Sequence, residues 1–336
     1  MITKVQEKQG VEVYRLTGSK GAYVEILNYG ARLHHLYVPS RTGELLDVIA
    51  GFNDVTEYLG DNPYFNAVIG RVSNRIKGAA FTFQGKRYSL FPNEGVNHLH
   101  GGREGFDRKF FTAKIEGEEL LMTYCTAPNE EGYPGSMQVS VRYSFSQNNV
   151  LSIRFSATCD QDTPVSLTSH AYFNLSGDFN KDILDTRVRI AGSAFTEFDD
   201  DLIITGAIPK VEGTPYDFRK ERSIEERMYE PVPALQKVQG YDNNYILDEK
   251  EPAAVAVCPQ TGIRLTVFCN APCLQFYTGN LLHGEEGRNK YNIHAAFCME
   301  PQEYPDAVNN PAFPLCVLRK GERYERFITY AFDVEK

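Results

Sequence analysis

Strict alternation of apolar and polar residues over 137–160 is the feature that most restricts what this chain can fold into. Apolar side chains occupy every second position from Val139 to Phe145 and again from Leu151 to Cys159, with a turn-forming Gln-Asn-Asn run between the two stretches. A period of two sends successive side chains to opposite faces of a strand. The segment therefore predicts an antiparallel hairpin with one buried face and one face in water.

Two more segments, 81–90 and 255–269, repeat this pattern around turns that contain glycine. Many strands at hairpin spacing with little helical periodicity are typical of a β-sandwich or a barrel. The chain shows no internal repeat, no low-complexity tract and no Gly/Ser linker. We therefore expect an all-β, mostly antiparallel fold in which residues 1–336 form a single domain.

Helical structure is expected in only two short places. Residues 223–229 can form a short helix, with Ser223 as its N-cap and Glu226 completing a capping box. Residues 54–59 can form a single turn. The Pro-rich stretch 209–233 is predicted to be a long surface excursion.

Charge and composition narrow the choice of partners and of compartment. The chain carries 35 Lys+Arg against 44 Asp+Glu, and this net charge of −9 argues against nucleic acid or an anionic membrane as a partner. The first ten residues lack the features of a signal peptide, and no run of about 18 apolar residues could span a membrane. Seven scattered cysteines, mostly in strand-like apolar segments, indicate buried thiols and a cytoplasmic protein.

Several motifs for phosphate or metal binding are excluded or disfavoured. No Gly-rich loop ends in Lys-Ser/Thr, so nucleotide hydrolysis has no support. Cys269 and Cys273 lack a second close pair of ligands, which favours core cysteines over a zinc site, and the acidic run 199–201 lacks the spacing of a calcium loop. His34 and His35 are adjacent in a strand-like segment, so they are predicted to point to opposite faces and not to share a ligand. The sequence thus predicts no metal site.

A carboxylate that closes an apolar run raises the first functional hypothesis. Glu300 follows the apolar segment 295–299 and precedes Pro301. Burying an unpaired ionised carboxylate costs several kcal/mol, and Pro301 and Pro305 mark the end of a strand. Glu300 is therefore predicted to be the last residue of a buried strand, where it is either half of a salt bridge or a catalytic acid or base.

Histidines in glycine-rich or aromatic company are the next candidates. In NHLHGG (97–102), His98 and His100 share a face if the segment is extended, and two glycines follow. In SLTSHAYFNLSG (166–177), His170 lies in an aromatic-rich strand with Tyr172 on the same face. Taken singly, a strand histidine is usually a hydrogen-bonded core residue.

Three further segments place polar residues beside turns or strand ends. GRVSNRIKG (70–78) brings Asn74 and Arg75 together before a glycine, and GYDNNYIL (240–247) sets Asp242 at a strand entry. LQFYTGN (274–280) puts Gln275 and Tyr277 on one strand face. Each of these residues alone has an ordinary structural interpretation as an ion pair, a turn or a core contact.

Together, these segments resemble the aldose 1-epimerase, or galactose mutarotase, family. The matching segments are GRVSNRIKG, NHLHGG, SHAYFNLSG, GYDNNYIL, QFYTGN and EPQEYPDAVNNP, in the family's order from residue 70 to residue 311. The resemblance implies a galactose mutarotase-like β-sandwich and an enzyme that interconverts the α and β anomers of free hexoses such as galactose and glucose. The loops 54–66 and 193–240 match no motif, which leaves the preferred sugar open.

The resemblance also implies a role for each site residue. Glu300 would be the general base and His170 the general acid for ring opening and closure. The substrate-binding residues would be Asn74, Arg75, His100, Tyr172, Asp242 and Gln275, with His98 behind them. No cofactor would be required, and the partner would be a small aldose bound by a monomer or a homodimer.

Three other functions stay open at this stage. Most glycoside hydrolases need two carboxylates flanking the bond, for which Glu300 and Asp242 could serve, but His170 would then have no role. In a non-catalytic sugar-binding module the histidine and the carboxylate would be incidental. A sugar-phosphate epimerase would need several convergent cationic side chains, and the sequence offers only Arg75.

Overall fold

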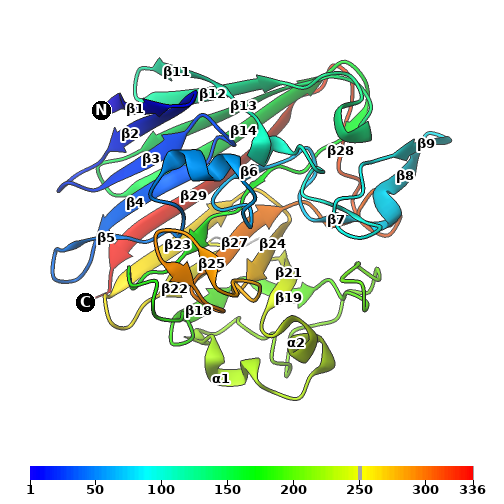
Figure 1. The fold of residues 1–336 in the computed structure, drawn as a ribbon. Coiled ribbons are helices and arrows are strands. Elements are labelled where there is room, and N and C mark those ends of the chain that lie inside the picture. Colours follow the sequence, from blue (N-terminus) through cyan, green and yellow to red (C-terminus); the bar gives the residue numbers. More distant parts are fainter. Residues whose placement is uncertain (249–251, 336) are drawn as a thin grey trace.

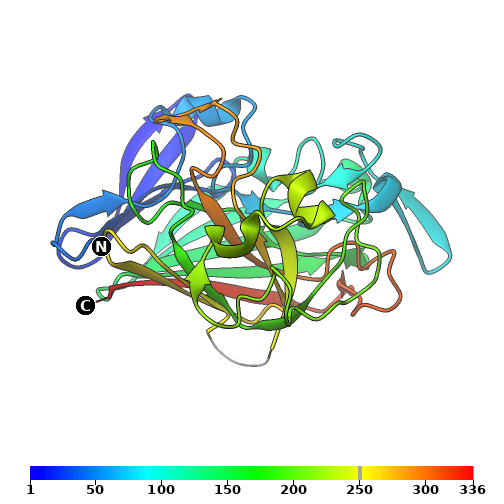
Figure 2. The same cartoon turned by 90° about the horizontal axis from the view of Figure 1, so that it is seen from below.

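Three antiparallel sheets in two layers form most of the molecule, whose structure is a computed structural model that describes residues 1–248 and 252–335. One sheet has nine strands and the other two have five each. The largest sheet spans the molecule (Figure 1), and the two smaller sheets lie on one side of it (Figure 2). The prediction of an all-β, mostly antiparallel sandwich with few short helices is confirmed.

The strands of each sheet are given in their spatial order. The nine-stranded sheet runs β11 (Thr112–Glu116), β12 (Glu119–Cys125), β13 (Met137–Phe145), β14 (Val150–Cys159), β29 (Tyr324–Val334), β23 (Ile263–Cys269), β22 (Ala254–Val257), β18 (Arg187–Ile190), β20 (Arg222–Ser223). The N-terminal five-stranded sheet runs β1 (Ile2–Lys8), β2 (Val11–Thr17), β3 (Tyr23–Leu27), β4 (Leu33–Pro39), β5 (Leu45–Asp47). The second five-stranded sheet runs β17 (Tyr172–Phe173), β27 (Phe297–Gln302), β24 (Cys273–Tyr277), β21 (Asp242–Leu247), β19 (Gly192–Phe195).

Five two-stranded ladders complete the strands. They are β6 (Val68–Ile69) with β16 (Thr168–Ser169), β7 (Arg75–Ile76) with β10 (His98–Leu99), β8 (Ala80–Phe83) with β9 (Lys86–Ser89), β15 (Thr163–Pro164) with β28 (Val317–Leu318), and β25 (Glu285–Glu286) with β26 (Lys290–Tyr291).

One apolar core joins the two layers. The same cluster of buried side chains includes Val24 of the N-terminal sheet, Ile153 of the nine-stranded sheet and Phe276 of the second five-stranded sheet. Burial in β13 alternates residue by residue, as its sequence predicts. The three predicted hairpins are confirmed as β13–β14, β22–β23 and β8–β9. Hydrophobic burial across this interface is the main force that holds the sheets face to face.

The helices are short and lie outside the sheets. They are α1 (Glu225–Met228) and α2 (Pro233–Val238), together with the 3₁₀ turns η1 (Val55–Leu59), η2 (Lys77–Ala79), η3 (Phe106–Arg108) and η4 (Glu130–Gly132). The turn over 54–59 is confirmed, because Asp54 caps η1 by accepting from the Thr56 N–H. Within residues 1–248 and 252–335, no helix has the length and apolarity needed to cross a membrane.

The predicted capping box at Ser223 is wrong. Ser223 pairs with Arg187 at the edge of the nine-stranded sheet, and α1 starts two residues later without a side-chain cap. The strand ladder satisfies the backbone of Ser223, so its hydroxyl is not needed as a cap. The sequence also gave no signal for α2, which follows directly and has proline in its first turn, where the missing N–H costs nothing.

The predicted end of the strand at Glu300 is also wrong, because β27 continues through Pro301 to Gln302. Proline is tolerated there for a topological reason. The neighbouring β17 pairs only with Phe297 and Cys298, while β24 pairs with Pro301 on the other side. Pro301 therefore lies where one side of β27 has no ladder partner, and the absent N–H breaks no hydrogen bond. Glu300 thus lies within β27, where it pairs with Gln275 of β24.

A β-bulge in β4 overturns the prediction for the paired histidines. Glu25 of β3 faces His35, whereas the next residue, Ile26, faces Leu33, so His34 is an extra residue in the ladder. Such a bulge breaks the period of two. Leu33 points into the core, while the rings of His34 and His35 lie together on the other face with centroids 4.2 Å apart. The two histidines therefore share a face instead of pointing to opposite ones.

Candidate active site

A cavity of about 230 Å³ opens over the second five-stranded sheet. All eight residues singled out from the sequence line this cavity: Asn74, Arg75, His100, His170, Tyr172, Asp242, Gln275 and Glu300. Six further residues complete the wall: Pro63, Tyr64, Glu94, Leu99, Tyr277 and Leu281. Residues scattered from 63 to 300 thus form one concave surface large enough for a small polar ligand.

The floor of the cavity is built from neighbouring strands. Gln275 of β24 lies directly opposite Glu300 of β27, so both side chains emerge on the same face. Gln275 Nε2 donates to Asp242 Oδ1 at 2.6 Å, and Asn74 Nδ2 donates to Gln275 Oε1 at 3.2 Å. These bonds fix the orientation of three polar side chains before any ligand binds.

His170 and Glu300 face each other at the centre of this floor. Nε2 of His170 lies 3.8 Å from Oε1 of Glu300, and the two side chains are only 7% and 3% exposed. His170 lies between the short strands β16 and β17 and not within one strand, as the sequence had suggested. An acid–base pair at this distance leaves room for a substrate oxygen to approach both groups.

Aromatic rings hold the imidazole of His170 in place. The Tyr172 ring stacks on it with centroids 4.9 Å apart, and His100 meets it edge-on at 5.3 Å. Tyr64 lies roughly parallel to it at 6.1 Å. On the side away from the cavity, Cys298 Sγ lies 3.4 Å from Nδ1 of His170. With Nδ1 turned inward, Nε2 is the nitrogen presented to Glu300 and the cavity.

Burial sets the protonation of the pair. It lowers the pKa of His170 to about 4, and it raises the pKa of Glu300 well above its usual value, with the negative charge of Asp242 adding to the second shift. Both shifts favour the uncharged form of each group, so when the pair holds a single proton, burial favours that proton on Glu300. One proton shared between two facing groups is the number that general acid–base catalysis requires.

His100 is positioned by a link between two sequence motifs. Leu99 of β10 pairs with Arg75 of β7, and His100 then turns back with φ of 52°. Its Nδ1 accepts from the backbone N–H of Asn74 at 3.2 Å. Burial lowers the pKa of His100 well below its usual value, so the ring is neutral and Nε2 carries the hydrogen. His100 is thus a hydrogen-bond donor toward the cavity.

The structure explains why glycine follows His100 in the same motif. Gly101 has φ of 93°, and a Cβ there would lie 1.9 Å from the carbonyl oxygen of Gly70. Only glycine fits this contact. Close packing of the two loops keeps His100 and Asn74 on the same wall.

His98 does not share a face with His100 as expected, and it is not among the residues that line the cavity. Its Nδ1 bonds to the carbonyl of Phe91 at 2.7 Å, and its Nε2 lies 2.7 Å from the hydroxyl of Tyr133. The expectation assumed an extended segment, but the positive φ of His100 ends the alternation one residue after β10. His98 is a fully bonded core histidine.

Arg75 is held by an acid that the sequence did not reveal. Its Nε and Nη2 both donate to Glu94, each at 2.6 Å. Such a two-point pair fixes the plane of the guanidinium and leaves its remaining N–H groups for a ligand. Glu94 is the third carboxylate of the wall, after Glu300 and Asp242, and it is neutralised by Arg75.

Tyr64 and the apolar residues of the rim were missed because they sit in loops without a motif. Tyr64 has φ of 61° and meets His100 edge-on at 4.8 Å. Tyr277, predicted from the sequence to share a strand face with Gln275, lies edge-on to His170 at 6.5 Å. Phe198, Leu202 and Ile204 line a small recess that also touches Asp242 and Gln275. The unmatched loops therefore do shape the cavity.

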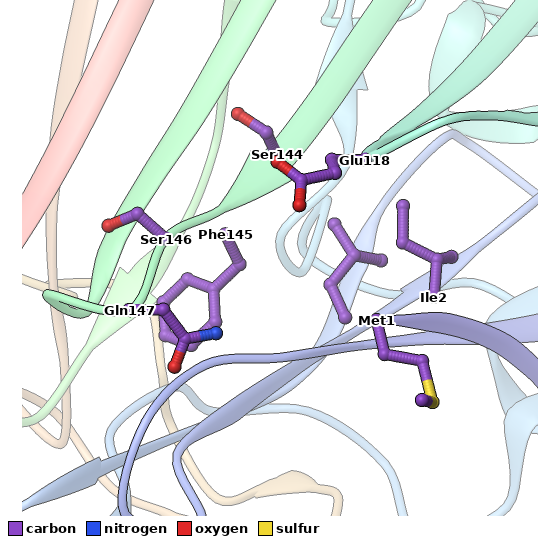
Figure 3. Close-up of a pocket in the computed structure, with 8 residues that line it drawn as sticks. Met1, Ile2, Glu118, Ser144, Phe145, Ser146 and Gln147 are labelled. Atoms are coloured by element: carbon purple, nitrogen blue, oxygen red, sulfur yellow. The ribbon is translucent and has the colours of Figure 1, made fainter.

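A second cavity, of about 240 Å³, shares no lining residue with the first and is shown in Figure 3. It is lined by Met1, Ile2, Leu16, Glu118, Ser144, Phe145, Ser146 and Gln147. Glu118 is the sole carboxyl or imidazole side chain of this lining, so the second cavity offers no acid–base pair.

Two side-chain groups in residues 1–248 and 252–335 have the composition and spacing to hold a metal ion. One is the cavity residues His170 and Glu300 with Cys298 behind them, and the other is Glu25, His34 and His35 at the bulge of β4. The described cysteines Cys269 and Cys273 belong to neither group. In the cavity, the same atoms serve the acid–base pair.

A buried histidine–carboxylate pair that faces a small polar cavity has the geometry for acid–base chemistry on a small molecule. The sequence profile of the family described as aldose 1-epimerase matches residues 12–331. A galactose mutarotase from Sus scrofa is 38% identical over 317 residues, covering 93% of this chain and 91% of the relative. The aldose 1-epimerase of Escherichia coli K12 is 32% identical, covering 97% and 96%. The chain therefore belongs to the aldose 1-epimerase family.

Solved structures agree with this assignment. A GalM/aldose epimerase homologue from C. elegans has a TM-score of 0.89 at 28% identity, covering 97% of this chain and all of its own. A galactose 1-epimerase from Lactobacillus acidophilus has a TM-score of 0.88, and at 24% identity this likeness concerns the fold alone.

Proposed function

We propose that this protein is a mutarotase that interconverts the α and β anomers of free aldoses such as galactose and glucose. The observation that carries the proposal is the buried His170–Glu300 pair, 3.8 Å apart, facing a cavity lined by hydrogen-bonding side chains. Relatives named galactose mutarotase and aldose 1-epimerase support the substrate class.

In the proposed reaction the pair moves two protons. Glu300 removes the proton of the C1 hydroxyl while His170 protonates the ring oxygen O5; the C1–O5 bond breaks and a C1 aldehyde forms. Rotation about C1–C2 and the reverse transfers close the ring from the other face. Each transfer contributes roughly 10²–10⁴-fold in rate. The two residues recover their protons in every cycle, so the proposed reaction uses no cofactor.

Substrate binding would bring the proton to the side of the pair where it is needed. In the empty cavity burial favours the proton on Glu300. A bound C1 hydroxyl donates to the carboxylate and O5 accepts from the imidazolium, and both bonds stabilise the form with Glu300 ionised and His170 charged. The pair is thus arranged to accelerate a proton transfer that proceeds more slowly in water.

The other side chains of the wall would orient the sugar. Asn74, Arg75 and His100 can donate to ring and hydroxyl oxygens, and Asp242 and Gln275 can bind hydroxyl groups from below. Arg75 can also stabilise the negative charge that develops on O5. Tyr172 would act mainly by holding His170 in its plane.

A glycoside hydrolase fits the site less well. That chemistry needs two available carboxylates, but Glu94 is paired with Arg75, and Asp242 accepts from Gln275. A sugar-phosphate epimerase would need more than one cationic side chain, and Arg75 is the one cation in the cavity lining.

Polarimetry tests the proposal directly. Fresh α-galactose with the protein should reach equilibrium rotation faster than without it, whereas a non-catalytic binding module would leave the uncatalysed rate unchanged. His170→Asn and Glu300→Gln should each abolish most of the acceleration, and the double variant should be little worse than either, because residues that act as a unit are not additive. A rate panel over galactose, glucose, xylose and arabinose would identify the preferred sugar.

The proposal also covers the compartment, the domain organisation and the partners of the protein. Cys125, Cys159, Cys258, Cys273, Cys298 and Cys316 are free thiols, which supports a reducing compartment such as the cytoplasm. A core shared by all three sheets supports one domain over 1–336. We expect a monomer or a homodimer, with neither nucleic acid nor a membrane as a partner, in keeping with the net charge of −9.

A further inference from the structure

The bulge in β4 gathers three side chains that commonly bind metal on the outer face of the N-terminal sheet. One carboxylate oxygen of Glu25 and one ring nitrogen each of His34 and His35 lie within 4.8 Å of one another. Ligands of a tetrahedral zinc ion are roughly 3.3 Å apart, so small side-chain rotations would close the set. Figure 1 shows β3, β4 and β5 side by side in this sheet.

Both histidines are oriented through Nδ1. Asp47 on β5 lies 2.6 Å from Nδ1 of His35, and the hydroxyl of Tyr58 lies 3.3 Å from Nδ1 of His34. Histidines that bind a metal through one nitrogen usually donate the other N–H to a carboxylate or another oxygen, which fixes the tautomer and the ring plane. This arrangement leaves Nε2 of each ring as the ligand.

The second layer of contacts is also complete around the carboxylates. Asp47 accepts from the backbone N–H of Leu36 at 3.0 Å and from Nη1 of Arg288. Glu25 accepts from Arg15 through Oε1 alone, with N–O distances of 2.9 and 2.6 Å. Oε2 of Glu25 is therefore the oxygen available to an ion.

Access and chemistry point to the kind of ion. The side chain of His35 is 19% exposed, while that of Glu25 is 8% exposed, so a small ion can enter past His35 but a larger ligand cannot. Two imidazoles and one carboxylate, with a fourth position for water, suit zinc and neighbouring first-row metals better than calcium or magnesium, which prefer all-oxygen sites.

We propose that Glu25, His34 and His35 form a binding site for a divalent transition-metal ion of the zinc type, separate from the sugar cavity. Arg15 opposes the ion, because its guanidinium shares the carboxylate of Glu25. The affinity is accordingly expected to be in the micromolar range, well below that of a closed structural zinc site.

Calorimetric titration of the chelator-treated full-length protein with zinc chloride tests the proposal. One equivalent should bind. His35→Ala and the isosteric Glu25→Gln should each weaken binding by more than the roughly 10–100-fold that loss of an outer-layer partner costs. Arg15→Met, which keeps an apolar stem, should tighten binding by up to about tenfold, since it removes the competing cation. A purely structural cluster would not show that gain.

Matched controls locate the ion. His283→Ala removes an exposed histidine elsewhere and should leave binding unchanged. Cys298→Ser removes the thiol of the other cluster and should also leave it unchanged. Cobalt should give a nitrogen- and oxygen-ligated spectrum without a thiolate charge-transfer band. Absence of binding at millimolar zinc, binding unaffected by both His35→Ala and Glu25→Gln, or a thiolate band would each overturn the proposal.

Discussion

Two clusters in this molecule contain nearly the same side chains but are built in opposite ways. The cavity cluster has His170 and Glu300, and the outer cluster has His34, His35 and Glu25, all on or beside β-strands. Glu300 faces only a histidine at ion-pair distance among the described residues, whereas Glu25 is paired with an arginine.

The two clusters differ in whether an arginine balances the charge of the buried carboxylate. In the outer cluster, Arg15 balances Glu25 and Arg288 balances Asp47, so the carboxylates are satisfied in the folded state. In the cavity, burial is left uncompensated, and the pKa of Glu300 is raised while that of His170 is lowered. The buried pair without a balancing charge has shifted pKa values that favour proton exchange, whereas the carboxylates paired with arginine stabilise the fold.

The largest expected effect is a loss of catalytic rate when the carboxylate of the cavity cluster is changed. Glu300→Gln should reduce turnover of α-galactose by about 10²–10⁴-fold, which corresponds to about 2.7–5.5 kcal/mol of barrier. The free energy of unfolding of this variant should be unchanged or higher at pH 7, so the variant is at least as stable as the parent protein. Because the pKa of Glu300 is raised in the folded protein, the unfolded chain ionises first as pH rises, and the free energy of unfolding falls. Glutamine does not ionise, so the variant avoids this loss.

The matched control for that variant is Glu25→Gln. The same chemical change at a buried but paired carboxylate should lower the free energy of unfolding and leave the turnover of α-galactose nearly unchanged. Polarimetry and urea unfolding of both variants give the four numbers needed. A large rate loss in Glu25→Gln, or near-normal turnover in Glu300→Gln, would remove the contrast.

The second prediction tests the outer cluster itself. Asp47→Asn keeps the shape of the side chain but weakens its bonds to His35 and Arg288, so we expect a loss of about 2–3 kcal/mol of stability. The rate measured at a temperature where the variant is folded should stay within about twofold. Chemical denaturation checks the first value, and an unfolding curve identical to that of the parent protein would contradict it.

The third prediction concerns the one arginine of the cavity. Arg75→Ala should raise KM and lower kcat, with kcat/KM reduced by about 10–100-fold, because it removes a charged donor to the bound sugar and to O5. Glu94→Gln leaves the guanidinium in place but loosens it, so its effect should be smaller and fall mainly on KM. Equal losses in the two variants would mean that Arg75 acts only through its pairing.

The smallest expected effect is a shift of the pH profile. Asp242 adds negative charge near Glu300 and so strengthens the hold of the pair on its proton. Asp242→Asn should therefore move the alkaline limb of kcat to lower pH, because the pair then loses its last proton more easily. The measurement is a pH series of rates on α-galactose, corrected for the uncatalysed reaction. A limb that moves to higher pH would show that Asp242 acts on the pair in another way.

The parts of the structure that follow from local sequence were predictable. The hairpins β13–β14, β22–β23 and β8–β9 follow from alternation, and the residues of the cavity follow from segments that each carry a recognisable pattern. Those segments fix short-range geometry such as the turn after His100. No segment alone identified the site, and the cavity residues were predicted because six segments together, in their order from residue 70 to residue 311, resemble one family.

The parts that depend on register between distant residues were not predictable. The bulge at His34 exists because Glu25 and Ile26 pair with His35 and Leu33, a choice that Leu33 and Leu36 make jointly by entering the core. Two inward leucines three positions apart are the signal that was available. The pairing of Arg75 with Glu94 and the approach of Tyr64 to His100 depend on loops whose conformation no local pattern specifies.

The extra residue in β4 has a consequence for how this surface could change over generations. Because strand alternation is strict, substitutions at position 34 can alter the chemistry of the outer cluster but cannot move a side chain from one face to the other. Loss of a single codon there would restore the alternation, leave one histidine facing Glu25, and keep both leucines on the core side. Gain of one codon in an unbulged ancestor would create the cluster in one step. The cluster is therefore a trait that an insertion or deletion can switch on or off while the enzyme's cavity, built on another sheet, continues to work.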